Sequence, residues 1–198
     1  MNVEIVRRAG GVEPQQPGWS AEGALDALVA RLYRLRDAAP EQCDYALTRL
    51  LPPDTLLGLP ESTALLCDAV QRGRKIVVVG DFDVDGATST ALAVSALRAM
   101  GHEQVGFFVP NRFVYGYGLS PAIVEQVSAR GAELIITVDN GISSLEGVEA
   151  ANLAGIDVLV TDHHLPGAVL PAAAAIVNPN QPGCGFPSKS LAGVGVIF

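Results

Sequence analysis

The chain has 198 residues, a formal net charge of −8 at pH 7 and a hydrophobic content of 49%. This length excludes two full domains, and the lack of any uninterrupted apolar run of roughly 18 residues excludes a membrane span. Three widely spaced cysteines with no CxxC pair predict reduced thiols in a cytoplasmic protein, without a disulfide or zinc framework.

The first third of the sequence predicts a small helical region over residues 1–73. Glycines and prolines recur in residues 10–18, which predicts a loose arm. Apolar residues recur at helical spacing over residues 20–39, and shorter helical pieces are expected over residues 43–51 and 62–71. The expected breaks are Pro52, Pro53 and Pro60.

From Lys75 onward, short apolar or β-branched runs alternate with helical patterns. This alternation implies right-handed βαβ crossovers. The predicted fold class for residues 74–198 is therefore α/β, a mainly parallel sheet flanked by helices. The expected strands cover residues 76–79, 105–109, 134–138 and 158–161, with a further one at 174–177.

Three helices are expected between these strands. The first covers residues 87–100. Ser120 is the expected N-cap of the second, with Pro121 at its first position. Ser143 and Glu146 match a capping box for the third.

The last residues, 191–198, are apolar and predict the opening of a buried helix that has no closing glycine and no polar tail. We therefore expect the chain to be a fragment of a longer protein, with the α/β domain over residues 74–198 truncated at its C-terminal end.

Polar side chains follow the first four expected strands. Because the carboxyl ends of parallel strands meet at one edge of a sheet, where open α/β folds bind ligands, these side chains are expected to converge. In chain order they are Asp81, Asp83 and Asp85; Asn111 and Arg112; Asp139; and Asp162, His163 and His164.

A cluster of like charges is costly unless it binds cations. Carboxylates with one or two imidazoles suit Mn²⁺ or Mg²⁺, with zinc or iron as further options. Two ions about 3.5–4 Å apart can activate water and hold a phosphoester, and Arg112 can then clamp a phosphate oxygen. Residues 75–198 carry eleven acidic and five basic side chains, and two divalent ions would offset most of that excess. The acidity therefore does not exclude a nucleic-acid substrate.

Each motif by itself has other interpretations. The Asp81–Gly86 segment matches the start of an EF-hand loop, although Leu92 stands where that loop needs Glu. It also fits haloacid-dehalogenase-like phosphatases or a structural turn. The Asp162–His164 triplet is often a polar turn. Gly116 and Gly118 either bring backbone towards a substrate phosphate or form a flexible loop. The joint pattern at the strand ends favours a metal centre.

Five segments together resemble the RecJ-type exonucleases of the DHH phosphoesterase superfamily. They are VVVGDFDVDGATST, VPNRFVYGYGLSP, TVDNGISS, VTDHHLPG and NPNQPGCGFPSKSLAGVGV, and they cover the chain from Lys75 nearly continuously. The second segment favours the RecJ type over the small-molecule members of the superfamily.

The resemblance implies roles for the residues in these segments. The implied metal ligands are Asp83 and Asp85 with Asp81 beside them, Asp139 as a carboxylate bridging both ions, and His163. The remaining implied roles are a metal or scissile-phosphate contact for His164, orientation of a histidine for Asp162, and phosphate handling for Asn111 and Arg112.

The function implied by the resemblance is 5′-to-3′ degradation of single-stranded DNA in repair and recombination, aided by Mn²⁺ or Mg²⁺. The family also supplies a further metal-binding Asp, a second core domain and an oligonucleotide-binding fold beyond the DHH triplet. We therefore do not expect this fragment alone to be active.

Two other functions stay open. The first is a DHH-family hydrolase of small phosphates or short oligonucleotides. The second is a catalytically inactive RecJ-like scaffold of a replication complex, which is disfavoured because every ligand position within the covered span is filled. The expected partner is single-stranded DNA, and the sequence identifies no repair-protein partner.

Overall fold

The computed structural model describes residues 24–39, 42 and 46–198, and the chain divides into two compact units, Met1–Leu51 and Pro52–Phe198. The first unit contains α1 (Ala24–Arg34) and the 3₁₀ turn η2 (Leu47–Arg49). The predicted arm at residues 10–18 lies outside the described residues. The same holds for the first residues of the helices expected over residues 20–39 and 43–51. Among the described residues, no helix has the length and apolar character needed to cross a bilayer.

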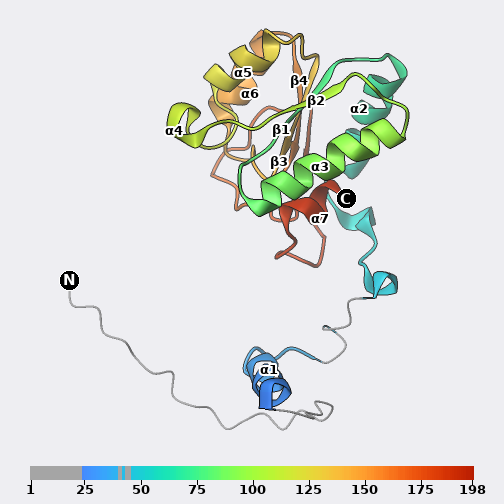
Figure 1. Ribbon diagram of the computed structural model, residues 1–198, viewed down its shortest axis with the longest axis vertical. Helices are drawn as coiled ribbons and strands as arrows, with labels where there is room; N and C mark the ends of the chain where they lie inside the picture. Colours follow the sequence, from blue (N-terminus) through green and yellow to red (C-terminus); the bar gives the residue numbers. More distant parts are fainter. Residues whose placement is uncertain (1–23, 40–41, 43–45) are drawn as a thin grey trace, which may run out of the picture. The chain divides into compact units, whose positions relative to one another are not determined.

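The second unit is built on a five-stranded sheet in which every neighbouring pair is parallel. The strand order is β2-β1-β3-β4-β5, so the chain crosses from β2 over β1 to reach β3 (Figure 1). The predicted α/β fold class is confirmed. The strands are β1 (Ile76–Val79), β2 (Val105–Phe108), β3 (Leu134–Val138), β4 (Asp157–Thr161) and β5 (Ala175–Val177).

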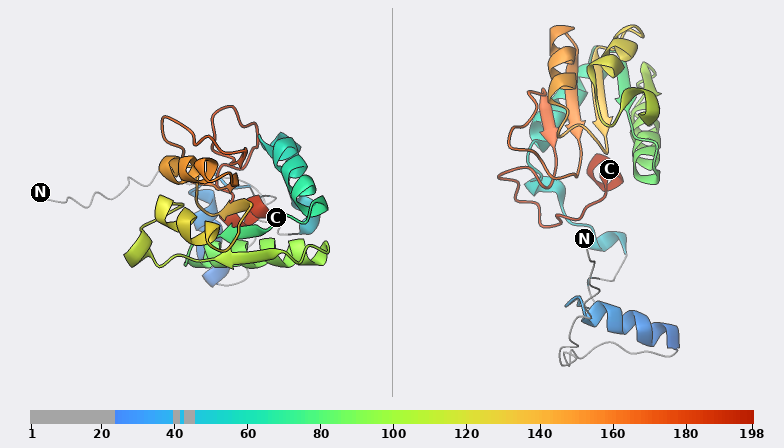
Figure 2. Two further views of the ribbon diagram at one scale, coloured as in Figure 1. Left: turned by 90° about the horizontal axis from the view of Figure 1, so that it is seen from above. Right: turned by 90° about the vertical axis from the view of Figure 1, so that its left-hand side faces the viewer.

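Helices cover both faces of this sheet, as Figures 1 and 2 show. One hydrophobic cluster joins Ile76 and Val78 to α2, α3 and α7, and a second joins Val77 and Val79 to α5 and α6. Successive side chains of a strand point to opposite faces, which is why a fully buried strand feeds both clusters. The helices are α2 (Leu59–Gln71), α3 (Val84–Ala99), α5 (Pro121–Ser128), α6 (Leu145–Leu153) and α7 (Gly193–Ile197).

Two short elements complete the second unit, η3 (Pro53–Thr55) and the one-turn helix α4 (Arg112–Tyr115). The boundary between the two compact units lies after Leu51, so α2 belongs to the same unit as the sheet, where it contacts β5. The predicted domain boundary at residue 73 remains a prediction.

Two helices begin earlier than expected. Pro60 does not interrupt the helix, because it lies in the first turn of α2, where the backbone N–H groups have no helical hydrogen-bond partner to lose. The expected start of α3 near Ala87 is also wrong, since Asp83 caps this helix by accepting a hydrogen bond from the Gly86 amide at 2.9 Å. The third acidic residue of the motif, Asp85, therefore lies in a helical first turn.

The predicted helix caps are corrected in detail. Ser120 occupies the N-cap position of α5 with Pro121 next, but its hydroxyl makes no capping hydrogen bond. The N-cap of α6 is Ser144, so the capping box based on Ser143 is wrong. The Ser144 hydroxyl instead accepts a hydrogen bond from the Leu119 amide at 3.0 Å, which ties the start of α6 to the loop that enters α5.

Candidate metal centre at the carboxyl edge of the sheet

Residues from three different strand ends meet at one point on the carboxyl edge. Asp139, His163 and His164 offer ligand atoms that all lie within 4.8 Å of one another, and so do Asp81, Asp83 and Asp139. Asp139 is common to both groups. The sheet topology explains this meeting, because β3 lies between β1 and β4.

Asp139 is the most constrained member of the centre. Its backbone is left-handed, with φ of 60°, and its side chain is buried. Asp tolerates this conformation better than most residues do, and such strain is concentrated at functional sites. The Asp139 amide donates to the Thr161 carbonyl at 3.1 Å, and its own carbonyl accepts from the Tyr117 hydroxyl at 3.1 Å. Its carboxylate lies 3.0 Å from His163 Nε2.

The protonation of Asp139 reflects this crowding. Burial, together with the charges of Asp85 and Asp83, raises the pKa of the Asp139 carboxyl from 3.8 to about 6. The ionised form is therefore disfavoured where only protein groups surround it, and a cation would stabilise it.

Asp162 organises the two histidines. Its buried Oδ1 accepts hydrogen bonds from the amides of His163 at 2.7 Å and His164 at 3.1 Å, and lies 2.7 Å from His164 Nδ1. Its Oδ2 accepts from the Ile142 amide at 2.9 Å. Burial lowers the pKa of His164. The hydrogen bond and the charge of Asp162 raise it, and together with other nearby charges they outweigh the effect of burial, so the pKa lies above its ordinary value. Of the two histidine rings, Asp162 contacts that of His164, and its predicted orienting role remains a prediction.

The three acidic residues of the first motif have different surroundings. Asp83 and Asp81 belong to the second donor group, whereas Asp85 accepts hydrogen bonds from the amides of Gly193 and Val194, each at 2.7 Å. Its Oδ2 also lies 3.5 Å from His163 Nε2. The predicted ligand role of Asp85 remains a prediction, because both its oxygens hold α7.

Arg112 reaches the centre from the end of β2. Its guanidinium pairs with Asp81 through two nitrogens, of which Nε lies 3.1 Å from Oδ1. The same group stacks on two rings, 4.2 Å from the centroid of Phe82 and 5.0 Å from that of Tyr117. The predicted phosphate-handling residue Asn111 caps α4, since its Oδ1 accepts from the Phe113 amide at 3.0 Å. These contacts fix the guanidinium beside the acidic groups.

The donor set fits a hard divalent cation. Carboxylate oxygens dominate it and imidazoles complete it, which is the combination that Mn²⁺ and Mg²⁺ accept. The raised pKa of the Asp139 carboxyl agrees with this, because burial and the charges of Asp85 and Asp83 disfavour its ionised form, which a bound cation would stabilise.

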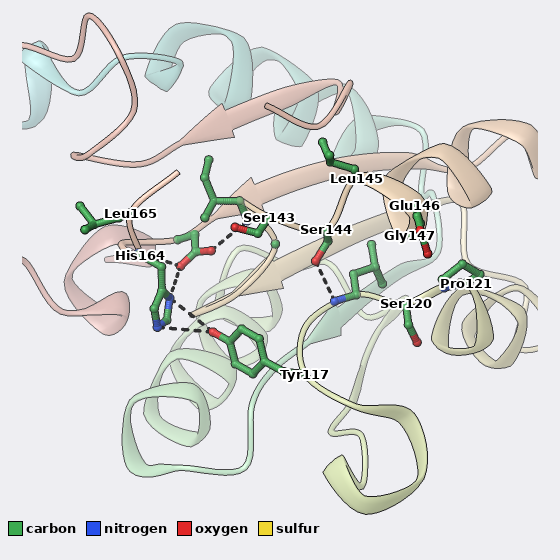
Figure 3. Close-up of a pocket in the computed structure, with 14 residues that line it drawn as sticks. Tyr117, Ser120, Pro121, Ser143, Ser144, Leu145, Glu146, Gly147, His164 and Leu165 are labelled. Carbon is green, nitrogen blue, oxygen red and sulfur yellow. Dashed lines mark hydrogen bonds and ion pairs between the residues drawn. The ribbon is translucent and has the colours of Figure 1, made fainter. Parts of the chain in front are cut away.

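A pocket of about 780 Å³ adjoins the centre, between the starts of α5 and α6. Figure 3 shows Tyr117 and His164 facing each other at one end, with Ser120 and Ser144 further along. The Tyr117 hydroxyl lies 3.4 Å from each ring nitrogen of His164. The pocket thus opens directly onto one of the candidate ligands.

Sequence reasoning missed three residues of this region, Tyr117, Asn178 and Asn180. Asn178 follows β5 as Asp139 follows β3, so the rule that selected the other strand ends also points to it. No sequence periodicity points to Tyr117, because it lies in the loop between α4 and α5. Its contact with the Asp139 carbonyl depends on the tertiary structure.

Comparisons with known proteins agree with this geometry. The DHH family, N-terminal domain, matches residues 75–198. The chain is 55% identical over 175 residues to the single-stranded-DNA-specific exonuclease RecJ of Escherichia coli (strain K12), covering 88% of this chain and 30% of that protein. The chain therefore spans about a third of the length of the curated relatives it matches.

Two solved structures have the same fold. A crystal structure of exonuclease RecJ bound to manganese has a TM-score of 0.66 at 37% identity, over 74% of this chain and 36% of that one. RecJ from Thermus thermophilus in complex with Mg²⁺ has a TM-score of 0.50 at 31% identity, over 85% of this chain and 20% of that one. Both of these proteins hold a divalent metal ion.

Proposed function

The chain belongs to the DHH family, whose N-terminal domain matches residues 75–198, and we propose that it supplies metal-binding residues of a 5′-to-3′ exonuclease for single-stranded DNA. The similarity to RecJ exonucleases supports this substrate, and we assign the activity to DNA repair and recombination. Since the chain spans 30% of such a relative, the proposal concerns a full-length protein that contains this segment.

The observation that carries the proposal is that two donor groups share one carboxylate. Asp139 belongs with His163 and His164 on one side and with Asp81 and Asp83 on the other. Each group would hold one Mn²⁺ or Mg²⁺, and Asp139 would be a ligand common to both. Such ions polarise a phosphate and lower the pKa of a water molecule that attacks it.

The chain's own residues bind and orient the substrate in this proposal. Arg112 is held rigid by Asp81 and two aromatic rings, and its remaining N–H groups contact a nonbridging phosphate oxygen. His164 is oriented by Asp162, whose Oδ1 lies 2.7 Å from its Nδ1, so that its ring binds a metal ion or contacts the same phosphate. The Tyr117 hydroxyl, whose pKa burial raises, stays protonated and continues to donate to the Asp139 carbonyl.

The test uses the full-length protein and two oligonucleotides, one single-stranded and one duplex, each labelled at the 5′ end. With Mn²⁺ we expect preferential release of the label from the single strand, lost on chelation and in Asp139→Asn. Full activity in Asp139→Asn would contradict the metal assignment.

Two further outcomes separate the alternatives. Hydrolysis confined to pyrophosphate or short oligonucleotides would indicate a small-phosphate hydrolase. Inertness towards every substrate, with Mn²⁺ still bound, would indicate a scaffold.

A further inference from the structure

Two asparagine side chains bind the backbone carbonyls of the two histidines. Asn180 Nδ2 donates to the His163 carbonyl at 2.6 Å, and Asn178 Nδ2 donates to the His164 carbonyl at 3.0 Å. The amides of both histidines are already bound to Asp162. The backbone of each histidine is therefore fixed through its N–H and its C=O, which leaves only the side-chain torsions to direct the imidazole.

Asn178 uses both ends of its amide group. It is fully buried directly after β5, level with Asp162, whose amide donates to the Val177 carbonyl at 3.1 Å. While its Nδ2 donates to His164, its Oδ1 accepts from the Asn180 amide at 2.7 Å. A carboxylate has no N–H to donate and a leucine has neither group, so neither could replace asparagine here.

The loop that carries these asparagines is itself anchored. Lys189 Nζ donates to the carbonyls of Pro179 at 2.6 Å and Cys184 at 2.9 Å. Gln181 Nε2 donates to the carbonyls of Leu57 at 2.9 Å and Ile176 at 3.0 Å. The loop is thus tied to itself, to β5 and to the segment before α2, and it can resist movement of the histidine backbone.

Small rotations of the histidine peptides would move the rings out of place. His163 Nε2 lies 3.0 Å from Asp139 Oδ1, and the two imidazoles meet edge to face with centroids 4.7 Å apart. Metal ligands need this kind of support, because partners beyond the ligands set ring orientation.

We propose that Asn180 and Asn178 are positioning residues that set the directions of the His163 and His164 rings, respectively. The inference builds on the metal site of the proposed function and does not depend on nuclease activity. It also gives a role to the NPN segment at residues 178–180.

The first test reads ring geometry without metal. The chain has only three histidines, so long-range ¹H–¹⁵N spectra of the imidazoles can be assigned, with buried His102 as an internal reference. In the full-length protein with chelator, Asn180→Ala should shift mainly the ring nitrogens of His163, and Asn178→Ala those of His164. Any histidines outside this segment are assigned by substitution.

A matched control separates positioning from general stability. Asn152 Nδ2 donates to the Ala172 carbonyl at 2.9 Å, the same kind of bond at the far end of α6. Asn152→Ala should leave the ring signals of His163 and His164 in place. Unshifted rings in folded Asn180→Ala, or equal shifts in Asn152→Ala, would overturn the inference. Asn180 is partly exposed, so its variant decides the matter if Asn178→Ala does not fold.

The second test measures Mn²⁺ affinity by calorimetry. Loss of a partner that orients a metal ligand weakens binding about ten- to a hundred-fold, and we expect this for each of the two variants. Asn180→Ser, which keeps a donor, should recover part of the loss. Wild-type affinity in Asn180→Ala would count against the inference. If the wild-type protein binds no Mn²⁺ while the ring shifts follow the expected pattern, the proposed function fails and the positioning role stands.

Discussion

The Asp85 carboxylate accepts a 2.7 Å hydrogen bond from the backbone amide of Gly193, 108 residues further along the chain. This contact draws α7 against the candidate metal centre, so closely that a Cβ added at Gly193 would lie 2.9 Å from the Cβ of Asp139. The first acidic motif and the last helix are therefore parts of one packed unit.

Gly193→Ala should consequently destabilise the protein. The added methyl group would lie 2.9 Å from Cβ, 3.0 Å from Oδ1 and 3.2 Å from Cα of Asp139, and Cβ cannot move away without a shift of the backbone. Overpacking of this kind costs about 1–3 kcal/mol. Chemical denaturation of the metal-free protein measures the effect. Gly195→Ala is the control on the same helix, because its methyl would meet only the flexible side chain of Leu191. Equal losses in both variants would contradict the expectation.

Asp139 should make the metal-free protein less stable as the pH rises. The pKa of its carboxyl is 3.8 in the ordinary state and about 6 in the folded chain, so the folded state binds this proton more tightly. Its stabilising contribution is present below about pH 4 and lost as the pH rises through about 6.

Asp139→Asn removes that loss. With chelator at pH 8, we expect the variant to be more stable than the wild-type protein by on the order of 1–3 kcal/mol, because each unit of the pKa shift corresponds to about 1.4 kcal/mol. Added Mn²⁺ should raise the melting temperature of the wild-type protein only, by mass action. A variant whose advantage does not grow between pH 4 and pH 8 would show that Asp139 is not the group responsible.

Phe82→Ala should weaken substrate binding through Arg112. Removal of the ring 4.2 Å from the guanidinium loses a cation–π contact worth about 0.5–1 kcal/mol at an exposed site, which corresponds to a rise in KM of about two- to five-fold. Steady-state kinetics of the full-length protein on a single strand measures this rise. Phe107→Ala is the matched control, since Phe107 is 57% exposed and Phe82 is 59% exposed. An equal change in KM for Phe107→Ala would point to a general surface effect.

Tyr117→Phe should loosen the strained backbone at Asp139. The lost hydroxyl leaves the Asp139 carbonyl without its 3.1 Å donor, at a cost of about 0.5–1.5 kcal/mol in the free energy of unfolding. Mn²⁺ affinity should fall with it. Tyr115→Phe, in which the ring still packs edge-on against Phe108, serves as the control. Unchanged stability and affinity in Tyr117→Phe would show that other contacts hold Asp139.

Much of the fold could be predicted because it follows from local patterns. Buried β-branched runs predict strands, and their alternation with helices predicts parallel pairing. Parallel pairing then brings the strand ends to one edge, which is why Asp139 and the Asp162–His164 triplet were found without knowledge of the strand order. The starts of α3 and α6 could not be placed as well, because several polar residues there compete as caps.

The sequence by itself determined which residues reach the carboxyl edge, because strand periodicity fixes where each strand ends. Only the tertiary structure decided how they are paired. Arg112 pairs with Asp81 across 31 residues, Asp85 holds Val194 across 109, and Asn178 reaches His164 from a neighbouring strand. These contacts depend on which strands are neighbours and on how closely helices approach them, and no local pattern of residues encodes either.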